Sequence, residues 1–187
     1  MIKKLSAFLA GAALTCLASC TPAQKEASTK EYTPIEVTVP ERPTGQQDVI
    51  ELTAPKLDTV RVGFIGLGMR GPSAVERWTH IPGTKIVALG DLVPEKAEKA
   101  QKIVTHAGME APALYSGNED AWKQLCERDD IDLVYIVTDW KHHAEMGVYA
   151  MEHGKHAAIE VPAAMTLDEI WALVNTSEKT RKHCMQL

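Results

Sequence analysis

Short apolar runs alternate with longer amphipathic stretches from Val60 to the end of the chain. This alternation is typical of parallel strands joined by helices. It predicts strands over residues 60–65, 85–89, 113–115, 131–137, 156–159 and 183–187, and helices near 72 and over 94–106, 119–127, 143–153 and 166–182. The stretch IDLVYIV is apolar almost throughout, as in a strand buried on both faces. We therefore predict an α/β fold with a doubly wound parallel sheet.

Local signals set several of these boundaries. Pro72 stands where the first helix begins, a position at which its missing N–H costs nothing. Thr166 and Glu169 form a capping box at the start of the last helix. The sixth strand begins just before the sequence ends, so we expect residues 59–187 to be the front domain of a longer protein, with a second, substrate-binding domain beyond it.

The first twenty residues differ from the rest. Lys3 and Lys4 precede an apolar run too short for a comfortable membrane span, which is typical of a secretory signal. The run ends in Leu-Ala-Ser-Cys, which resembles a bacterial lipobox with Cys20 as the lipidated residue. We expect residues 1–20 to be a lipoprotein signal peptide and the exported protein to be anchored in the bacterial cell envelope through the lipid on Cys20, at the outer membrane or the periplasmic face. An ordinary signal peptide with an incidental cysteine is the alternative.

Residues 21–58 are rich in Thr, Pro, Glu, Lys and Gln, and the prolines break any long element. This composition predicts a flexible linker. Residues 34–40 alternate as in a short edge strand, but an extended spacer is the preferred interpretation.

Composition narrows the class of protein. The chain has 187 residues, a net charge of −5 and 45% hydrophobic residues, which suits one domain with a sizeable core and gives no indication of nucleic-acid binding. The histidines lack metal-ligand spacing, so we expect no metal site. Cys126 and Cys184 are either two buried thiols or a disulfide. Met146, Tyr149, Ala150 and Met151 form a helical stripe that should pack on the sheet.

A glycine pattern follows the first strand. Gly66 permits a tight turn, Gly68 lets the backbone approach a pyrophosphate, and Gly71 lets the helix pack on the strand. The helix N-terminus then offers N–H donors to phosphates, and Arg70 adds charge. Asp91 stands at the end of the second strand, where a carboxylate accepts hydrogen bonds from ribose hydroxyls and repels a 2′-phosphate. The motif predicts a Rossmann site for NAD rather than NADP. The alternative is a strand–turn–helix unit whose glycine turn binds no ligand.

A second group of residues follows the fourth and fifth strands. Thr138 to His143 and Glu160-Val161-Pro162 both stand at carboxyl ends of parallel strands, where ligands bind. With the glycine turn, these segments resemble the N-terminal half of the glucose-fructose oxidoreductase and inositol dehydrogenase (Gfo/Idh/MocA) family over residues 60–187. Two positions depart from that family's pattern: Asp139 replaces its proline, and Val161 replaces the lysine that helps to move the hydroxyl proton.

The valine in place of lysine points to one branch of the family. Glu-Val-Pro-Ala-Ala, Trp140 with His143, and the late Lys-His-Cys run resemble glycoside hydrolase family 109, the NAD-dependent α-N-acetylgalactosaminidases. The resemblance implies oxidation of the sugar at C3, elimination of the glycosidic oxygen after loss of the C2 proton, addition of water and re-reduction. Such a redox-neutral reaction suits an exported protein, which has no ready pool of cofactor.

The resemblance also implies roles for individual residues. Met69 and Arg70 would meet the pyrophosphate, Asp91 the adenosine ribose, and Glu160 and Val161 the nicotinamide ribose or ring. The residues expected around the nicotinamide half are Thr138, Trp140, Lys141, His142 and His143. The acid–base residues are expected mainly in the second domain. Glu160 is a weak catalytic candidate, with a strand-end carboxylate in a local hydrogen-bond network as its alternative.

Three functional hypotheses therefore stay open. The first is the front part of an exported glycosidase that acts on a glycan or small sugar, inactive without its second domain. The second is an exported sugar oxidoreductase, and the third a nucleotide-binding module without catalysis. The natural glycan and a homo-oligomeric state are left undecided by the sequence.

Overall fold

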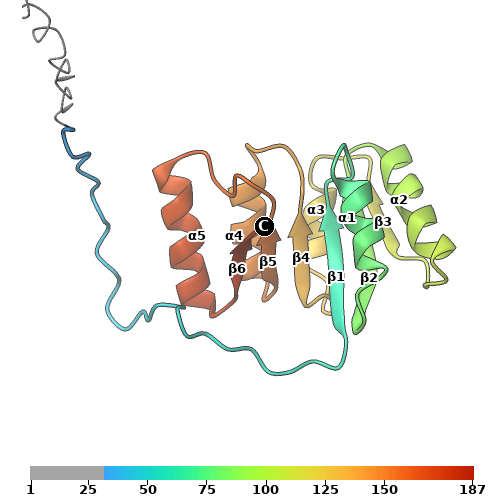
Figure 1. Ribbon diagram of the computed structural model, residues 1–187, viewed down its shortest axis with the longest axis horizontal. Coiled ribbons are helices and arrows are strands. Elements are labelled where there is room, and N and C mark those ends of the chain that lie inside the picture. The colour runs from blue at the N-terminus through green and yellow to red at the C-terminus, as the bar shows by residue number, and fades with distance from the viewer. Residues whose placement is uncertain (1–31) are drawn as a thin grey trace, which may run out of the picture. The chain divides into compact units, whose positions relative to one another are not determined.

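The structure is a computed structural model that describes residues 32–187 (Figure 1). The expected signal segment 1–20, its lipidation candidate Cys20 and the first part of the linker lie outside the described residues. Between residues 32 and 59 the chain forms turns and bends but no strand, so the edge strand considered for residues 34–40 is absent there. Within the described part, no helix combines the length and the apolar character needed to cross a membrane.

Six parallel strands form one sheet in the order β3-β2-β1-β4-β5-β6. The chain alternates strand and helix throughout: β1 Val60–Ile65, α1 Gly71–Trp78, β2 Thr84–Asp91, α2 Pro94–His106, β3 Ala113–Ser116, α3 Ala121–Cys126, β4 Leu133–Ile136, α4 His143–Glu152, β5 His156–Ile159, α5 Leu167–Thr180 and β6 Cys184–Gln186. The predicted doubly wound parallel sheet is confirmed. The main differences are at the ends of elements, where α3 and β4 are shorter than expected and β2 runs on to Asp91.

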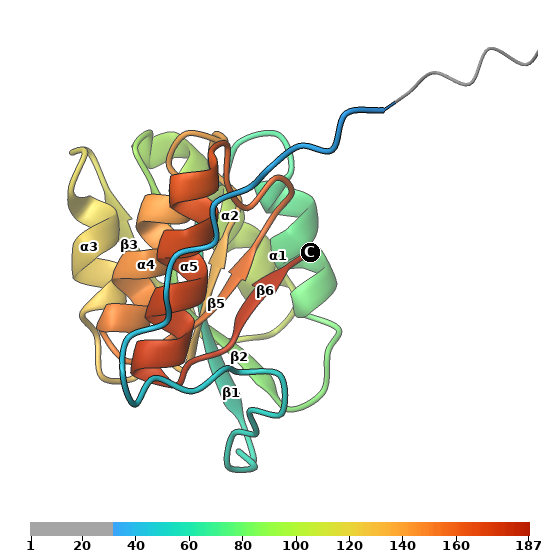
Figure 2. The same ribbon diagram turned by 90° about the vertical axis from the view of Figure 1, so that its left-hand side faces the viewer.

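Helices cover both faces of the sheet (Figure 2). On one face α1 and α2 pack over an aromatic group in which Phe64 stacks on Tyr135, with ring centroids 5.0 Å apart, and Trp78 meets both rings edge-on. On the other face α3, α4 and α5 pack on the second hydrophobic cluster. The order of the strands reverses direction between β1 and β4, and a crevice forms there at the carboxyl ends of the strands.

The predicted stripe on α4 packs on the sheet, with one exception. Met146, Ala150 and Met151 are buried, whereas Tyr149 is half-buried at the rim and donates its hydroxyl to Glu127 at 2.6 Å. Cys126 and Cys184, the two cysteines in the described part of the chain, are free thiols and do not form a disulfide. Burial raises the pKa of Cys126 to about 12, so this thiol stays protonated at neutral pH.

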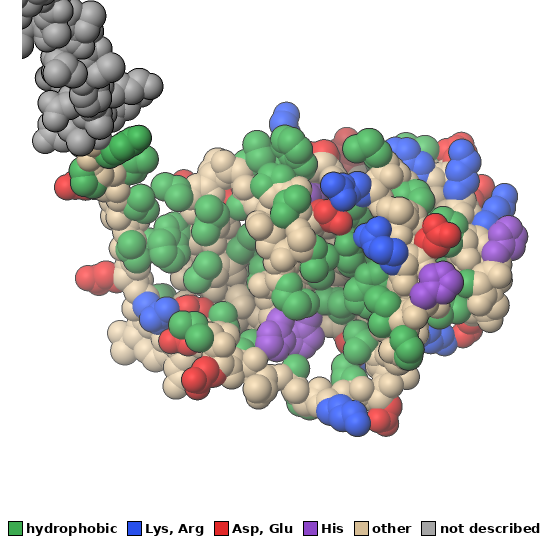
Figure 3. Space-filling model, viewed as in Figure 1, with side chains coloured by type: hydrophobic (Ala, Val, Ile, Leu, Met, Phe, Trp, Pro, Cys, Tyr) green, Lys and Arg blue, Asp and Glu red, His purple; other side chains and the backbone are tan. Residues whose placement is uncertain are grey.

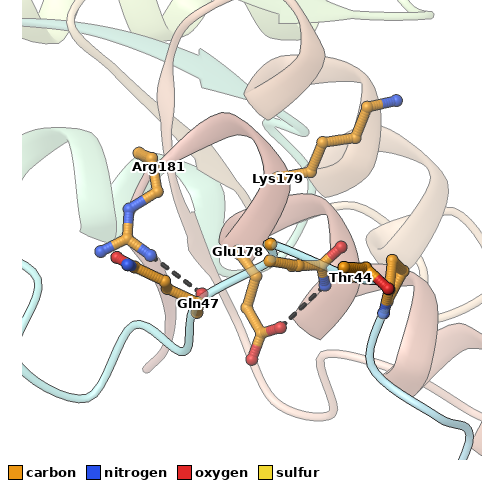
Figure 4. Close-up of a pocket in the computed structure, with 8 residues that line it drawn as sticks. Thr44, Gln47, Glu178, Lys179 and Arg181 are labelled. Atoms are coloured by element: carbon orange, nitrogen blue, oxygen red, sulfur yellow. Dashed lines mark hydrogen bonds between the residues drawn. The ribbon is translucent and has the colours of Figure 1, made fainter.

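The second half of the expected linker is packed against the folded domain. Pro40 begins the same compact unit as the sheet, and the chain after it packs against the C-terminal end of α5. Arg42 donates two hydrogen bonds to the buried carboxylate of Glu178, and Gln46 donates a third at 2.7 Å. Arg181 donates to the backbone oxygen of Gln47 (Figure 4) and also to that of Asp48. A composition that predicts flexibility therefore does not exclude docking when specific polar partners are present.

Charged side chains of both signs are interspersed on the visible face of the described chain (Figure 3). Several large apolar side chains are also exposed near α5 and β6, namely Leu167, Ile170, Met185 and Leu187. Scattered apolar side chains are ordinary on a protein surface.

An ion pair fastens β1 to the segment before β4. Asp132 accepts two hydrogen bonds from the guanidinium of Arg61 and one from its backbone N–H at 2.8 Å. The hydrogen bonds from Arg61 lower the pKa of Asp132 in spite of its partial burial, which acts in the opposite direction. The carboxylate therefore stabilises the fold above its ordinary pKa of 3.8, and this contribution is lost as the pH falls through the lower folded pKa.

Replacing Asp132 by Ala is expected to lower the free energy of unfolding by about 1–3 kcal/mol at neutral pH, because the partly buried N–H groups of Arg61 lose a charged acceptor. Urea unfolding at neutral and acidic pH measures the effect, which should shrink as the pH falls. Asp129→Ala is the matched control, since Asp129 is exposed and its side chain makes none of these hydrogen bonds. An equal loss in both variants would contradict the role assigned to Asp132.

Candidate dinucleotide-binding site

The turn after β1 depends on Gly66. Its φ of +96° lies in the region that favours glycine, and its N–H donates to the Gly90 oxygen at 2.8 Å. A Cβ at this position would lie 2.6 Å from backbone atoms of Val137 and Thr138. The turn and the carboxyl end of β4 can therefore approach this closely only with glycine at 66.

The other two glycines of the motif face different surroundings. A Cβ on Gly71 would lie 2.3 Å from the Gly66 oxygen, so α1 packs directly on the turn. A Cβ on Gly68 would meet no atom within 4 Å, because this residue borders open space. The sequence predicts close packing at Gly71 and close approach of a ligand at Gly68. The structure agrees with both expectations, since Gly71 is tightly packed and Gly68 borders open space.

Asp91 is tied to the glycine turn. One carboxylate oxygen accepts from the Leu67 N–H at 2.7 Å, and the other accepts from the Val93 N–H at 2.9 Å. The Lys96 ammonium lies 4.0 Å from the same carboxylate. The sequence predicts the position of Asp91 but not its hydrogen bond to the turn, because residues 67 and 91 meet only when β1 and β2 pair.

A cleft of about 820 Å³ opens at the carboxyl ends of the strands. Most residues of the sequence motifs line this cleft. They are Gly66, Gly68, Met69, Arg70, Asp91, Thr138, Asp139, Trp140, His142, His143, Glu160 and Val161. Met69 and Arg70 are exposed at its edge. Of the residues expected to touch the cofactor, Gly71 and Lys141 do not line the cleft. Gly71 is buried beneath the turn, and the Lys141 backbone N–H instead donates to Asp139 at 3.1 Å.

Sequence reasoning missed one wall of the cleft. Tyr115, Asn118, Glu119, Ala121 and Trp122 line it from the end of β3 and the start of α3. The signal was available in principle, because residues after a parallel strand share the edge at which ligands bind.

The segment after β4 carries an Asp–His pair at the mouth of the cleft. Asp139 Oδ2 lies 2.8 Å from His142 Nδ1, and the side chains are 63% and 51% exposed. Desolvation acts to raise the pKa of Asp139, but the hydrogen bonds it accepts and its contact with His142 outweigh this and lower it. Asp139 is therefore a carboxylate at neutral pH. The sequence identified Asp139 as a departure from the family pattern without assigning it a partner.

His143 differs from His142 in its surroundings. Its ring is only 1% exposed, with Nδ1 2.8 Å from the Pro162 oxygen and Nε2 3.3 Å from the Thr138 oxygen. These contacts join the segment after β4 to the segment after β5. His143, expected as a cofactor ligand, borders the cleft, but its nitrogens face backbone oxygens, so its main contribution is to hold the two segments together.

Glu160 lies at the end of β5 and accepts a hydrogen bond from the Tyr135 hydroxyl at 3.0 Å. Burial, together with this carboxylate, raises the pKa of Tyr135, so the phenol keeps its proton. The local network that the sequence raised as an alternative for Glu160 is therefore present, and the carboxylate still borders the cleft. Val161 beside it is half-exposed and offers no group that can transfer a proton.

The residues present fit a dinucleotide. Gly68 leaves room for a close approach, α1 begins at the turn with no acidic side chain in its first turn, and Asp91 stands at the end of the next strand. Among the described residues, no group of three or more His, Cys, Asp or Glu side chains could hold a metal ion. Fold and site together define a Rossmann domain with a nucleotide cleft at the reversal of strand order.

Comparison with known proteins gives the same class. The family model described as "Oxidoreductase family, NAD-binding Rossmann fold" matches residues 60–186. The chain therefore belongs to the Gfo/Idh/MocA family, and its domain is NAD-binding.

The chain is also similar to individual proteins of known family. The chain is 85% identical to "Glycosyl hydrolase family 109 protein 1" of Phocaeicola vulgatus over all of its own length and 40% of that protein. It is 70% identical to the protein of the same name in Bacteroides thetaiotaomicron, with 98% of this chain and 38% of that protein covered. Among solved structures, it resembles a myo-inositol dehydrogenase of Lactobacillus casei in complex with NAD(H) and myo-inositol, at 28% identity and a TM-score of 0.55, covering 64% of this chain and 33% of that one. The chain thus spans about two fifths of the length of these curated relatives.

Proposed function

We propose that this chain is the NAD-binding part of a glycoside hydrolase that removes terminal α-N-acetylgalactosamine. The observation that carries the proposal is the 85% identity, over the whole chain, to a protein named for glycoside hydrolase family 109. The structure supports it with a dinucleotide cleft bordered by Glu160 and Val161 at one end and by Asp91 at the other.

Different residues of the cleft would bind different parts of NAD. The glycine turn and the amino end of α1 would hold the pyrophosphate, and Asp91 would hold the adenosine ribose. The segments after β4 and β5, fixed to each other by His143, would border the nicotinamide half. When bound, NAD supplies the reversible oxidation of the C3 hydroxyl, which acidifies the C2 hydrogen and permits loss of the glycosidic oxygen.

The position of Val161 favours this reaction over lysine-assisted dehydrogenation. A valine at the cleft cannot exchange a proton with a substrate hydroxyl, so an enzyme that uses this position needs a different group. A redox-neutral cycle also agrees with the expected export, because the cofactor is regenerated within each turnover. The resemblance to a myo-inositol dehydrogenase supports the second candidate function, a sugar oxidoreductase.

An assay in deuterated water separates the two functions. The full-length product of the gene is given a chromogenic α-N-acetylgalactosaminide without added nucleotide. We expect release of the aglycone, no accumulation of NADH, and deuterium at C2 of the freed sugar, since the C2 proton leaves during elimination. The activity should appear in the cell-envelope fraction and leave it when Cys20 is replaced by Ala.

The controls are the corresponding β-glucoside and protein from which nucleotide has been removed. NADH that accumulates with free sugars while the glycoside stays intact would contradict the glycosidase and support the oxidoreductase. Bound NAD without either activity would support a binding module.

A further inference from the structure

Oxidation of an alcohol by NAD releases a hydride from carbon and a proton from oxygen, and the proton needs an acceptor in the cleft. In an uncharged state, a histidine with one free ring nitrogen is suited to this task. Among the described residues, the cleft is lined near the ends of β4 and β5 by two imidazoles, those of His142 and His143, and by two carboxylates, those of Asp139 and Glu160.

The contacts of these four groups differ. Both carboxylate oxygens of Asp139 are engaged, one by the Lys141 N–H and the other by His142 Nδ1. Both nitrogens of His143 face backbone oxygens, and its ring is buried. Glu160 already accepts the hydrogen bond from Tyr135. His142 has one nitrogen engaged, since only its Nδ1 contacts Asp139, and its side chain is half-exposed at the cleft. His142 therefore offers the available imidazole nitrogen at this end of the cleft.

Asp139 also determines which nitrogen is available. A carboxylate only accepts hydrogen bonds, so the contact at 2.8 Å places the imidazole proton on Nδ1. In the neutral ring, Nε2 then carries a lone pair and can take up a proton. The arrangement is fixed further because Asp139 Oδ1 accepts from the Lys141 N–H, which holds the carboxylate at the start of α4.

We propose that His142 Nε2 accepts the proton of the substrate hydroxyl and that Asp139 is its positioning residue. This inference rests on the proposed function. In the oxidation, the C–H bond breaks with its electron pair passing to the nicotinamide, the O–H proton passes to Nε2, and a ketone remains. The re-reduction returns both, so the histidine is neutral again at the end of the cycle.

A labelling experiment tests the placement of His142 without any turnover. Diethylpyrocarbonate modifies exposed neutral imidazoles, and mass spectrometry locates the modified residue. We expect His142 to react in the free protein and to become protected when NAD saturates the cleft. His153 is the matched control, because it is exposed at the other end of α4 with its Nδ1 2.8 Å from a backbone oxygen, and its reactivity should not change. Equal labelling of His142 with and without NAD, when calorimetry shows that NAD is bound, would overturn the proposal.

Kinetics on the full-length gene product tests the proton transfer. His142→Ala and His142→Gln are expected to lower kcat by about 100-fold or more, the range of general acid–base catalysis, with little change in the Kd for NAD. Added imidazole should restore part of the rate of the alanine variant. Asp139→Asn should give a mixture of His142 tautomers in ¹⁵N NMR, with a smaller loss of kcat.

The outcomes separate the two proposals. Wild-type rates in both His142 variants, alongside an active parent, would overturn the role of His142 and leave the glycosidase intact. If the parent binds NAD but cleaves no glycoside, the proposed function fails and the present inference fails with it. His153→Ala should keep the parent's rate and melting temperature.

Discussion

Replacing Gly68 by Val is expected to weaken NAD binding by about 10- to 100-fold, with the melting temperature of the free chain nearly unchanged. A Cβ at this position would meet no protein atom within 4 Å and its φ is not in the left-handed region, so we expect the fold to tolerate a side chain there. We expect the pyrophosphate to occupy the same space, and a clash of this kind costs about 1–3 kcal/mol. Calorimetric titration and a thermal melt on the same samples measure the two quantities.

A graded series makes this test sharper. Gly68→Ala should lose less affinity than Gly68→Val, because it places fewer atoms in the same space. Ala172→Val adds bulk on the exposed face of α5, away from the cleft, and should bind NAD as the parent does. Unchanged affinity in the Gly68→Val variant would show that no pyrophosphate lies against the turn.

The second large effect is expected at Asp91. Its replacement by Ala removes a charged acceptor from the proposed ribose site and leaves the Leu67 N–H without its acceptor at 2.7 Å. Hydrogen bonds to charged groups contribute about 1.5–3 kcal/mol, so the affinity for NAD should fall by about 10- to 100-fold. The affinity for NADP should fall less or rise, because the charge that repels a 2′-phosphate is gone.

Asp91→Asn separates the two contributions of this residue. The amide oxygen can still accept from the Leu67 N–H, so the melting temperature should stay closer to that of the parent than in the alanine variant. Since the charge is lost, discrimination against NADP should still decrease. An alanine variant that binds NAD normally and still excludes NADP would refute the ribose role of Asp91.

Much of the fold was predictable because it depends on local periodicity. The alternation of apolar runs predicts the strands, and the glycine spacing with Asp91 predicts where the cleft forms. The ends of elements were less predictable. Ile131 and Val137 extend the apolar run at either end and so look like strand, but the β4 ladder covers only Leu133–Ile136.

The rest depends on contacts between distant parts of the chain. Arg42 and Glu178 are 136 positions apart, and no local pattern indicates that a proline-rich segment docks on α5 through this pair. Likewise, two adjacent histidines at the start of α4 are equivalent in the sequence. Their difference arises because one ring is enclosed between the segments after β4 and β5, whereas the other pairs with Asp139 at the surface.

The central claim is that NAD binds in the cleft between the glycine turn, Asp91 and the segments after β4 and β5. Titration of the purified, nucleotide-free chain with NAD in a calorimeter tests it most directly. The account predicts one saturable site, a rise in melting temperature on binding, and weaker binding of NADP. A saturating titration with no heat and no thermal stabilisation would contradict it.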